Sequence, residues 1–310
     1  MSALAACGSA SGGSAATSSR LARWITFAHV KTPLDVAGPR ADGALVMAAA
    51  GRLFLVGPRG RVVGFAPAYQ SPGGEEPYIA LSPGGCFGNQ TVYALRLAKG
   101  RGVTAISTSG KVRRFATISA PGLPDGIAFG WGKLLVTINH SSTTTVDAID
   151  CHGRVRAVTR TAPKVEGGIA VAPSTFGRFA GDLIAPDEDG GRVFAITPGG
   201  RSVLVASSGL PHGGDIGVES EGFVPAGRYR AVTADRFTPN NRHPGDDVLL
   251  ALSSAALAKQ GVRAGDLLVA TEGGDRADAI SCTQAACRVR HVADGPSEAH
   301  GEGHIAFLKG

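Results

Sequence analysis

A short phrase recurs along the chain, in which an acidic residue and one or two glycines precede a small apolar strand. Its copies begin at Asp42, Glu76, Asp125, Glu166, Asp215 and Glu302. From residue 76 the copies are about 40 to 50 residues apart, and the last gap is about twice that length. This period, in a chain with many short apolar runs, indicates a β-propeller. We therefore predict an all-β, six-bladed β-propeller in which each phrase opens a blade beside the central channel.

The second half of the chain also repeats itself at the level of whole strand pairs. Residues 181–196 align with residues 265–280, and each copy is followed by a turn and a further strand. The apolar runs are short and bounded by Gly, Pro, Asn and Asp, which is typical of strands joined by tight turns. The one stretch that favours a helix is residues 253–260, which Gly261 would terminate.

The last phrase, at residues 302–308, forms an inner strand with almost no chain after it. We expect it to pair with N-terminal chain, at about residues 41–66. Closing the ring with strands from both termini would remove the open edge that a linear array of sheets exposes. We assign residues 24–310 to a single propeller domain, and residues 1–23 to a leader and tether.

Composition agrees with a globular chain and argues against one class of partner. The sequence has 310 residues with 45 glycines, 18 prolines and 18% charged residues, which permits a large core. The net charge is +6, but the Lys and Arg residues are scattered and aromatic residues make up only 6%. Nucleic-acid binding requires a clustered basic face, so we expect no nucleic-acid partner.

The N-terminus resembles that of a bacterial lipoprotein. Residues 4–7, Leu-Ala-Ala-Cys, resemble a lipobox, and the Gly/Ser-rich residues 8–19 resemble the tether that follows it. The resemblance implies lipidation of Cys7 and anchoring to the outer face of the cell membrane, or secretion. Because no run of about 20 apolar residues exists, we predict membrane contact only through a lipid anchor.

The other four cysteines are compatible with export. Cys282 and Cys287 flank a four-residue loop between two short strands, and cysteines in such a hairpin can reach disulfide distance. A reduced pair is the alternative. We predict the disulfide, because a zinc site would need further ligands. Cys86 and Cys151 could pair with each other or remain free.

The phrase at residues 123–128, Leu-Pro-Asp-Gly-Ile-Ala, is similar to the blade-opening phrase of the gluconolactonase (senescence marker protein) and NHL-repeat superfamily. The resemblance covers about residues 40–308 and implies a six-bladed propeller. It also implies a divalent cation in the central channel, often calcium, with Asp125 as one ligand and Glu302 as a counterpart of the first-blade acid. Asparagine ligands have no obvious counterparts here, and residues 129–135 replace the usual Leu-Trp continuation.

The acidic residues of the phrases would converge on the channel axis. Hard cations such as Ca²⁺ take six to eight oxygen ligands, which carboxylates from several blades can supply. Alternatively, each acid accepts backbone N–H bonds in the turn before its strand. The candidate metal ligands are Glu76, Asp125, Glu166, Asp215, Glu302 and the nearby His304.

Histidines form a second candidate group at the blade openings. His212 and His300 occupy equivalent places in the repeat, so either could act as the general base of a hydrolase. If the two faced each other across the channel, they could instead bind zinc or another transition metal. The alternative is a histidine hydrogen-bonded within a turn.

Two functions remain open from the sequence. The first is an exported, lipid-anchored propeller, monomeric and without catalysis, that binds a small-molecule ligand or a cell-envelope protein on one face. The second is a hydrolase of a lactone or another ester that depends on a divalent metal. A tightly held cation distinguishes the two, because only the hydrolase requires one.

Overall fold

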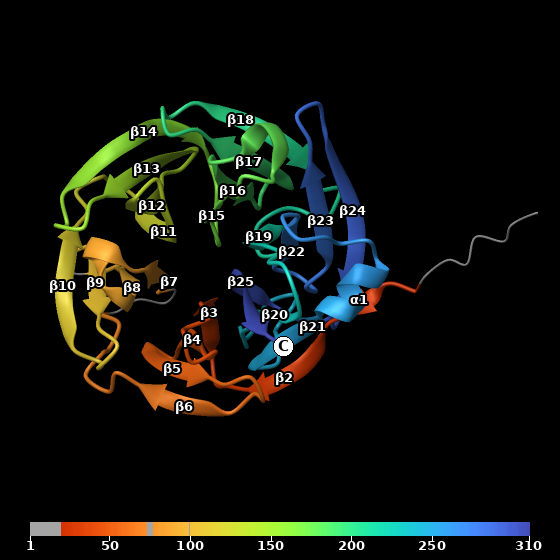
Figure 1. Ribbon diagram of the computed structural model, residues 1–310, viewed down its shortest axis with the longest axis horizontal. Helices are drawn as coiled ribbons and strands as arrows, with labels where there is room; N and C mark the ends of the chain where they lie inside the picture. Colours follow the sequence, from red (N-terminus) through yellow and green to blue (C-terminus); the bar gives the residue numbers. More distant parts are fainter. Residues whose placement is uncertain (1–19, 73–76, 99) are drawn as a thin grey trace, which may run out of the picture.

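The computed structural model describes residues 20–72, 77–98 and 100–310. Its strands lie in a ring around a central axis, as Figure 1 shows. This is the arrangement of a β-propeller, and the predicted all-β class is confirmed. Among the described residues, no helix is long and apolar enough to cross a membrane.

Four sheets within the described residues each contain four antiparallel strands, with the first strand nearest the axis (Figure 1). The first two sheets comprise β3 (Pro33–Ala37), β4 (Leu45–Ala49), β5 (Arg52–Val56) and β6 (Val62–Phe65), then β7 (Ile79–Pro83), β8 (Asn89–Arg96), β9 (Gly102–Ile106) and β10 (Val112–Thr117). The next two comprise β11 (Leu123–Gly130), β12 (Lys133–Asn139), β13 (Thr143–Ile149) and β14 (Val155–Pro163), then β15 (Ala170–Val171), β16 (Leu183–Asp187), β17 (Arg192–Ile196) and β18 (Ser202–Ser207).

The fifth sheet has nine strands among the described residues. In spatial order these are β1 (Ala22–Arg23), β24 (Cys287–Asp294), β23 (Ala277–Cys282), β22 (Leu267–Thr271), β19 (Val218–Phe223), β25 (Gly301–Lys309), β20 (Tyr229–Asp235), β21 (Val248–Ser253) and β2 (Ile25–His29). One parallel pairing, Glu221 with His304, joins β19 to β25. It divides the sheet into two groups of four antiparallel strands, with β1 added to one. The described strands thus form five hydrogen-bonded sheets and six four-stranded groups.

Closure of the ring uses both ends of the chain, as predicted. Strand β25 and strand β2 belong to the same four-stranded group, in which β20 and β21 separate them. The predicted partner of the last strand was wrong, however. Residues 41–66 form most of the first sheet, because β3 supplies the inner strand that β4 requires. Strand β25 pairs with β20 instead.

The phrase at Asp42 is a second correction. It precedes β4, the second strand of its sheet, whereas the inner strand is β3 and carries Asp35. Asp42 accepts the backbone N–H of Ala44 in an exposed turn. Asp42 therefore accepts a backbone N–H bond within a turn, as Asp side chains commonly do, and does not face the channel.

The predicted repeat and helix are both present. Residues 183–196 and 267–280 form the second and third strands of two sheet units, β16–β17 and β22–β23. Helix α1 (Ser254–Lys259) begins after Ser253, whose hydroxyl accepts the N–H of Ala256 at 3.1 Å. The 3₁₀ turns η1 (Gly85–Phe87) and η2 (Gly177–Phe179) are the other helical elements among the described residues.

Two disulfides lie within the described residues. Cys282 and Cys287 are bonded across the hairpin of β23 and β24, as predicted. Cys86 and Cys151, whose pairing the sequence left open, are bonded as well, with their Cα atoms 5.7 Å apart. Because Cys86 lies in η1 and Cys151 follows β13, this bond joins the second and third sheets.

Candidate functional site in the central channel

Inner strands from all six groups surround the channel, and glycines let them approach one another. A Cβ on Gly168 would lie 2.8 Å from the carbonyl oxygen of Gly303. Gly303 has a φ of +69°, and its own Cβ would lie 2.5 Å from Asp35 Oδ1. Side chains cannot occupy such positions. Close packing at the axis therefore explains the glycines in the phrases that begin at Glu166 and Glu302.

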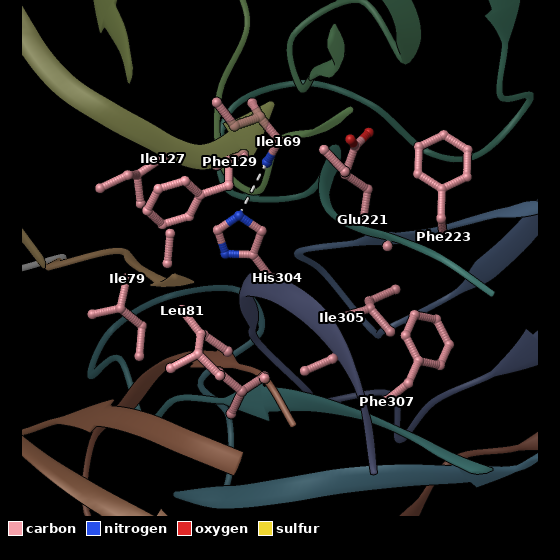
Figure 2. A pocket seen from close by; sticks show the side chains of 18 of the residues that line it. Ile79, Leu81, Ile127, Phe129, Ile169, Glu221, Phe223, His304, Ile305 and Phe307 are labelled. Atoms are coloured by element: carbon pink, nitrogen blue, oxygen red, sulfur yellow. Dashed lines mark hydrogen bonds between the residues drawn. The ribbon is translucent and has the colours of Figure 1, made fainter. Parts of the chain in front are cut away.

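One end of the channel is an apolar pocket of about 440 Å³. All six inner strands contribute to its wall, and most of the side chains that Figure 2 labels are aliphatic or aromatic. The labelled apolar residues are Ile79, Leu81, Ile127, Phe129, Ile169, Phe223, Ile305 and Phe307. Of the residues that sequence analysis singled out, His304 lines this pocket, but as a predicted metal ligand, so an apolar pocket was not predicted.

Glu221 is the acidic side chain in the wall of this pocket. It is completely buried, and neither carboxyl oxygen has a hydrogen-bond partner of good geometry. Burial raises the pKa of Glu221 well above its usual value, and the backbone N–H of Ala170 offsets only part of the effect. Burial therefore favours the protonated, neutral form of this side chain.

His304 lies beside Glu221 and is held on both ring nitrogens. Its Nδ1 lies 2.9 Å and 3.1 Å from the two oxygens of Asp35, and its Nε2 accepts the N–H of Ile169 at 3.3 Å (Figure 2). Asp35 is itself fully buried and also accepts the backbone N–H groups of Ile79 and His304. His304 thus ties three inner strands together, and in this arrangement neither nitrogen is available to a metal.

The other end of the inner strands carries a buried polar cluster. His300 Nε2 lies 3.0 Å from Glu272 Oε1 and 3.4 Å from Glu302 Oε1. Arg236 Nη1 lies 3.1 Å from the same oxygen of Glu302. Burial lowers the pKa of His300, but hydrogen bonds and charge from Glu272 and Glu302 outweigh it and raise the pKa to about 10.

Backbone pairing between the two halves of the nine-stranded sheet assembles this cluster. Glu272 directly follows β22, and its carbonyl oxygen accepts the N–H of Gly301 at 2.7 Å. The carbonyl oxygen of His300 accepts the N–H of Arg236, which directly follows β20. The cluster therefore combines residues from three strand ends that lie far apart in sequence.

Further carboxylates surround the cluster. Burial, followed by the charges of Glu272 and Glu166, raises the pKa of Glu188 to about 9. Burial and the charge of Glu166 also raise the pKa of Asp125 to about 8, with a smaller contribution from Glu302. Asp125 accepts hydrogen bonds from the side chain of Asn139 and the backbone of Gly167, each at 3.0 Å. Carboxyl groups therefore crowd together at this end of the channel, and two of them retain their protons to higher pH than usual.

The structure brings some of the predicted residues together and leaves others apart. Asp125, Glu166, His300 and Glu302 all lie at the polar end, where Glu166 also forms an ion pair with Lys164 at 3.1 Å. His212 and Asp215 are exposed in the turn before β19. Two further candidates, Glu76 and Cys7, lie outside the described residues.

Sequence analysis missed four acids of the channel: Asp35, Glu188, Glu221 and Glu272. Glu272 does carry the recognisable signal, because two glycines follow it. Glu272 was not predicted as a site residue because its two glycines come after a strand, whereas the recurring phrase comes before one. Asp35 and Glu221 interrupt inner strands, and an acid inside a strand that proves to be buried is a signal for a channel-facing side chain.

No protein-family profile matches the sequence, and no curated protein matches it. Solved structures resemble it at low identity. A protein of unknown function from Bacteroides thetaiotaomicron is 10% identical, with 91% of this chain and 67% of that chain covered and a TM-score of 0.53. Virginiamycin B lyase from Staphylococcus aureus is 13% identical, with 87% and 93% covered and a TM-score of 0.49. A putative gluconolactonase is 14% identical, with 75% and 92% covered and a TM-score of 0.40. These identities establish likeness of fold alone.

Proposed function

We propose that this protein is an exported β-propeller that binds a small, largely apolar ligand in the apolar end of its central channel. The observation that carries the proposal is the pocket of about 440 Å³ with the buried, unpaired carboxyl group of Glu221 in its wall. Ligand sites are typically concave, of about 300–1,000 Å³, and mostly apolar with a few placed polar groups. The pocket has each of these properties.

The chemistry of Glu221 narrows the class of ligand. A neutral carboxyl group offers one O–H donor and a carbonyl acceptor. Because the carboxyl group is completely buried, a ligand acceptor would reach its O–H only after the Glu221 side chain rotates, while the hydrocarbon part of the ligand would contact side chains such as Phe223 and Phe307.

Export is supported by the two disulfides, since such bonds persist in oxidising compartments outside the cytoplasm. Lipidation at Cys7 is part of the same proposal and would hold the propeller at the outer face of the membrane. We also propose that the protein acts as a monomer.

A metal-dependent hydrolase of a lactone or another ester is the second candidate function. The observation that favours it is the buried cluster of Glu272, His300 and Glu302, which could hold a cation. The cluster and the apolar pocket lie at opposite ends of the inner strands. Glu302 lies opposite Ala234 of β20 and Phe307 opposite Ala231, so the two are separated by about 10 Å, at about 3.3 Å per residue. The three residues of the cluster are buried and none of them lines the apolar pocket, so we place binding first.

The binding function can be tested with N-phenyl-1-naphthylamine, a neutral apolar probe that fluoresces in apolar pockets. We expect saturable binding of one equivalent to the wild type and its loss in Ala170→Phe, which places a large side chain in the pocket wall. Ala285→Phe, in the exposed hairpin turn, is the matched control and should bind the probe normally. Equal binding by Ala170→Phe, or none by the wild type, would refute the pocket.

The hydrolase candidate has a separate test. Hydrolysis of p-nitrophenyl acetate and of δ-gluconolactone would be measured after chelation and again after addition of Ca²⁺, Mn²⁺ or Zn²⁺. Activity that depends on the added ion and disappears in Glu302→Gln would favour catalysis. Absence of hydrolysis with every ion would remove the hydrolase from consideration.

A further inference from the structure

We propose that Glu272, His300 and Glu302 form a binding site for one divalent transition-metal cation, Zn²⁺ or Mn²⁺. The inference deepens the hydrolase candidate, for which it supplies the metal, but it stands apart from ligand binding at the apolar end. Each of the three residues offers one ligand atom, and these atoms lie within 4.8 Å of one another.

The geometry already approaches that of an occupied site. Ligand atoms bound at about 2.1 Å to a tetrahedral ion lie about 3.4 Å from one another. His300 Nε2 lies 3.0 Å from Glu272 Oε1 and 3.4 Å from Glu302 Oε1. Small movements of the side chains would therefore suffice to admit the ion.

A second, independent observation is a buried carboxylate oxygen without a partner. The side chain of Glu302 is only 2% exposed, and its Oε2 has no hydrogen-bond partner within the described residues. Arg236 contacts only the other oxygen, Oε1. A buried, unpaired carboxylate oxygen is costly unless a cation or donor satisfies it. A metal bound through Oε2 would supply that cation and would leave Oε1 to Arg236.

The charge around the cluster points the same way. Glu188 interacts directly with Glu272, and one of its oxygens, Oε1, is buried without a partner. Lys164, at the edge of the cluster, forms ion pairs with Glu166 and Asp189. It therefore does not neutralise the carboxyl groups of the cluster itself. Acidic side chains outnumber the basic side chains here, and a divalent ion takes several carboxylate ligands.

The donor set selects the class of ion. Calcium takes oxygen ligands almost exclusively, whereas an imidazole nitrogen together with carboxylates suits Zn²⁺ and Mn²⁺. Three protein ligands also leave a position for water or a substrate oxygen, as in catalytic zinc sites. The site therefore differs from the calcium site that resemblance to the lactonases implied, and Asp125 is not among its three ligands.

The test is metal analysis of tag-free protein. Chelated wild type would be dialysed against Zn²⁺, Mn²⁺ or Ca²⁺, its bound metal measured by mass spectrometry, and its affinity measured by calorimetry. We expect one equivalent of Zn²⁺ or Mn²⁺, with a higher melting temperature. Glu272→Gln and Glu302→Gln should each weaken binding at least about 10-fold, since even outer-shell partners are worth about 10- to 100-fold.

Glu298→Gln is the matched control, because this exposed acid lies two residues before His300 in the same loop. It should bind metal like the wild type. Circular dichroism and probe binding at the apolar pocket would establish that each variant is folded. Absence of metal from the wild type, unchanged binding in both cluster variants, or preference for Ca²⁺ would each overturn the proposal. Probe binding in the same samples reports on the apolar pocket separately.

Discussion

Glu221 on β19 and His304 on β25 form the parallel bridge that joins the two halves of the nine-stranded sheet. The two side chains differ in their hydrogen-bond partners. His304 is fixed by Asp35 and by the Ile169 backbone, whereas neither oxygen of Glu221 has a partner of good geometry. Buried polar groups with a structural role normally have hydrogen-bond partners. Glu221 is therefore the residue at this bridge for which we propose a role in ligand binding.

Replacing Glu221 with leucine should stabilise the ligand-free protein. The change removes a buried polar group without a good partner, and such a group costs about 1–3 kcal/mol. We expect a higher urea midpoint and a rise in the free energy of unfolding of that order. The exposed Glu298→Leu should change stability by less than about 0.5 kcal/mol. A destabilised Glu221→Leu protein would show that Glu221 has a structural role.

Stability should fall as pH rises when metal has been removed. The pKa of Asp125 is raised from 3.8 to about 8, so the folded protein retains a proton that the unfolded chain releases. Its contribution is therefore favourable below about pH 4 and is lost progressively up to about pH 8. Asp125→Asn should flatten this part of the profile, measured by urea unfolding in the presence of a chelator.

The control for this profile is Asp42→Asn. Asp42 opens the same kind of phrase but lies in an exposed turn, where it caps Ala44. Its profile should follow that of the wild type. If Asp125→Asn also retained the wild-type slope, Asp125 would not be the group responsible.

Loss of the Cys86–Cys151 disulfide should cost more than loss of the Cys282–Cys287 disulfide. Loop-closure entropy gives about 4 kcal/mol for the first, whose cysteines are 65 residues apart. The second, with a separation of 5, gives about 2 kcal/mol. Double Cys→Ser variants at each pair, compared by thermal and urea unfolding, would measure the two. The opposite order would mean that the unfolded chain remains compact between the second and third sheets.

Asp35→Asn should destabilise the propeller by about 2–4 kcal/mol, because it breaks a buried hydrogen-bonded network. Asp35 accepts from the backbones of Ile79 and His304 and from the His304 ring, which joins three inner strands. Asp42→Asn, in the same N-terminal sheet unit, should have little effect. Equal unfolding midpoints for the two variants would contradict a structural role for Asp35.

Much of the ring architecture was predictable because its main constraints are local. Several inner strands pack so closely at the axis that only glycine fits there. Because the strands recur at a regular interval, the phrase of an acid and glycine recurs in the sequence. The phrase correctly marked the region of β11 and β25, and hence Asp125, His300 and Glu302 at the polar end. It failed at Asp42 because the turn between an inner strand, β3, and the second strand, β4, can use the same residues.

The connection within the last two groups could not be predicted. After β19 the chain passes to β20 and β21 in the neighbouring group, then returns to form β22, β23 and β24. The sequence contains short strands and turns here but no mark of which strands pair, since pairing depends on contacts between distant residues. This crossing brings Glu272 to His300. The sequence identified His300 and Glu302 as candidates, but it could not predict that Glu272 would join them in one cluster.

By itself, the sequence determined the all-β class, the period of the ring, the Cys282–Cys287 bond and the acidic character of one end of the channel. These follow from composition and short-range spacing, which act within a few residues. Only the tertiary structure decided that Glu221 would be buried in an apolar wall and that Asp35 would hold His304. A carboxyl group has the same chemistry in every strand, but its burial and partners are set by side chains that arrive from other parts of the chain.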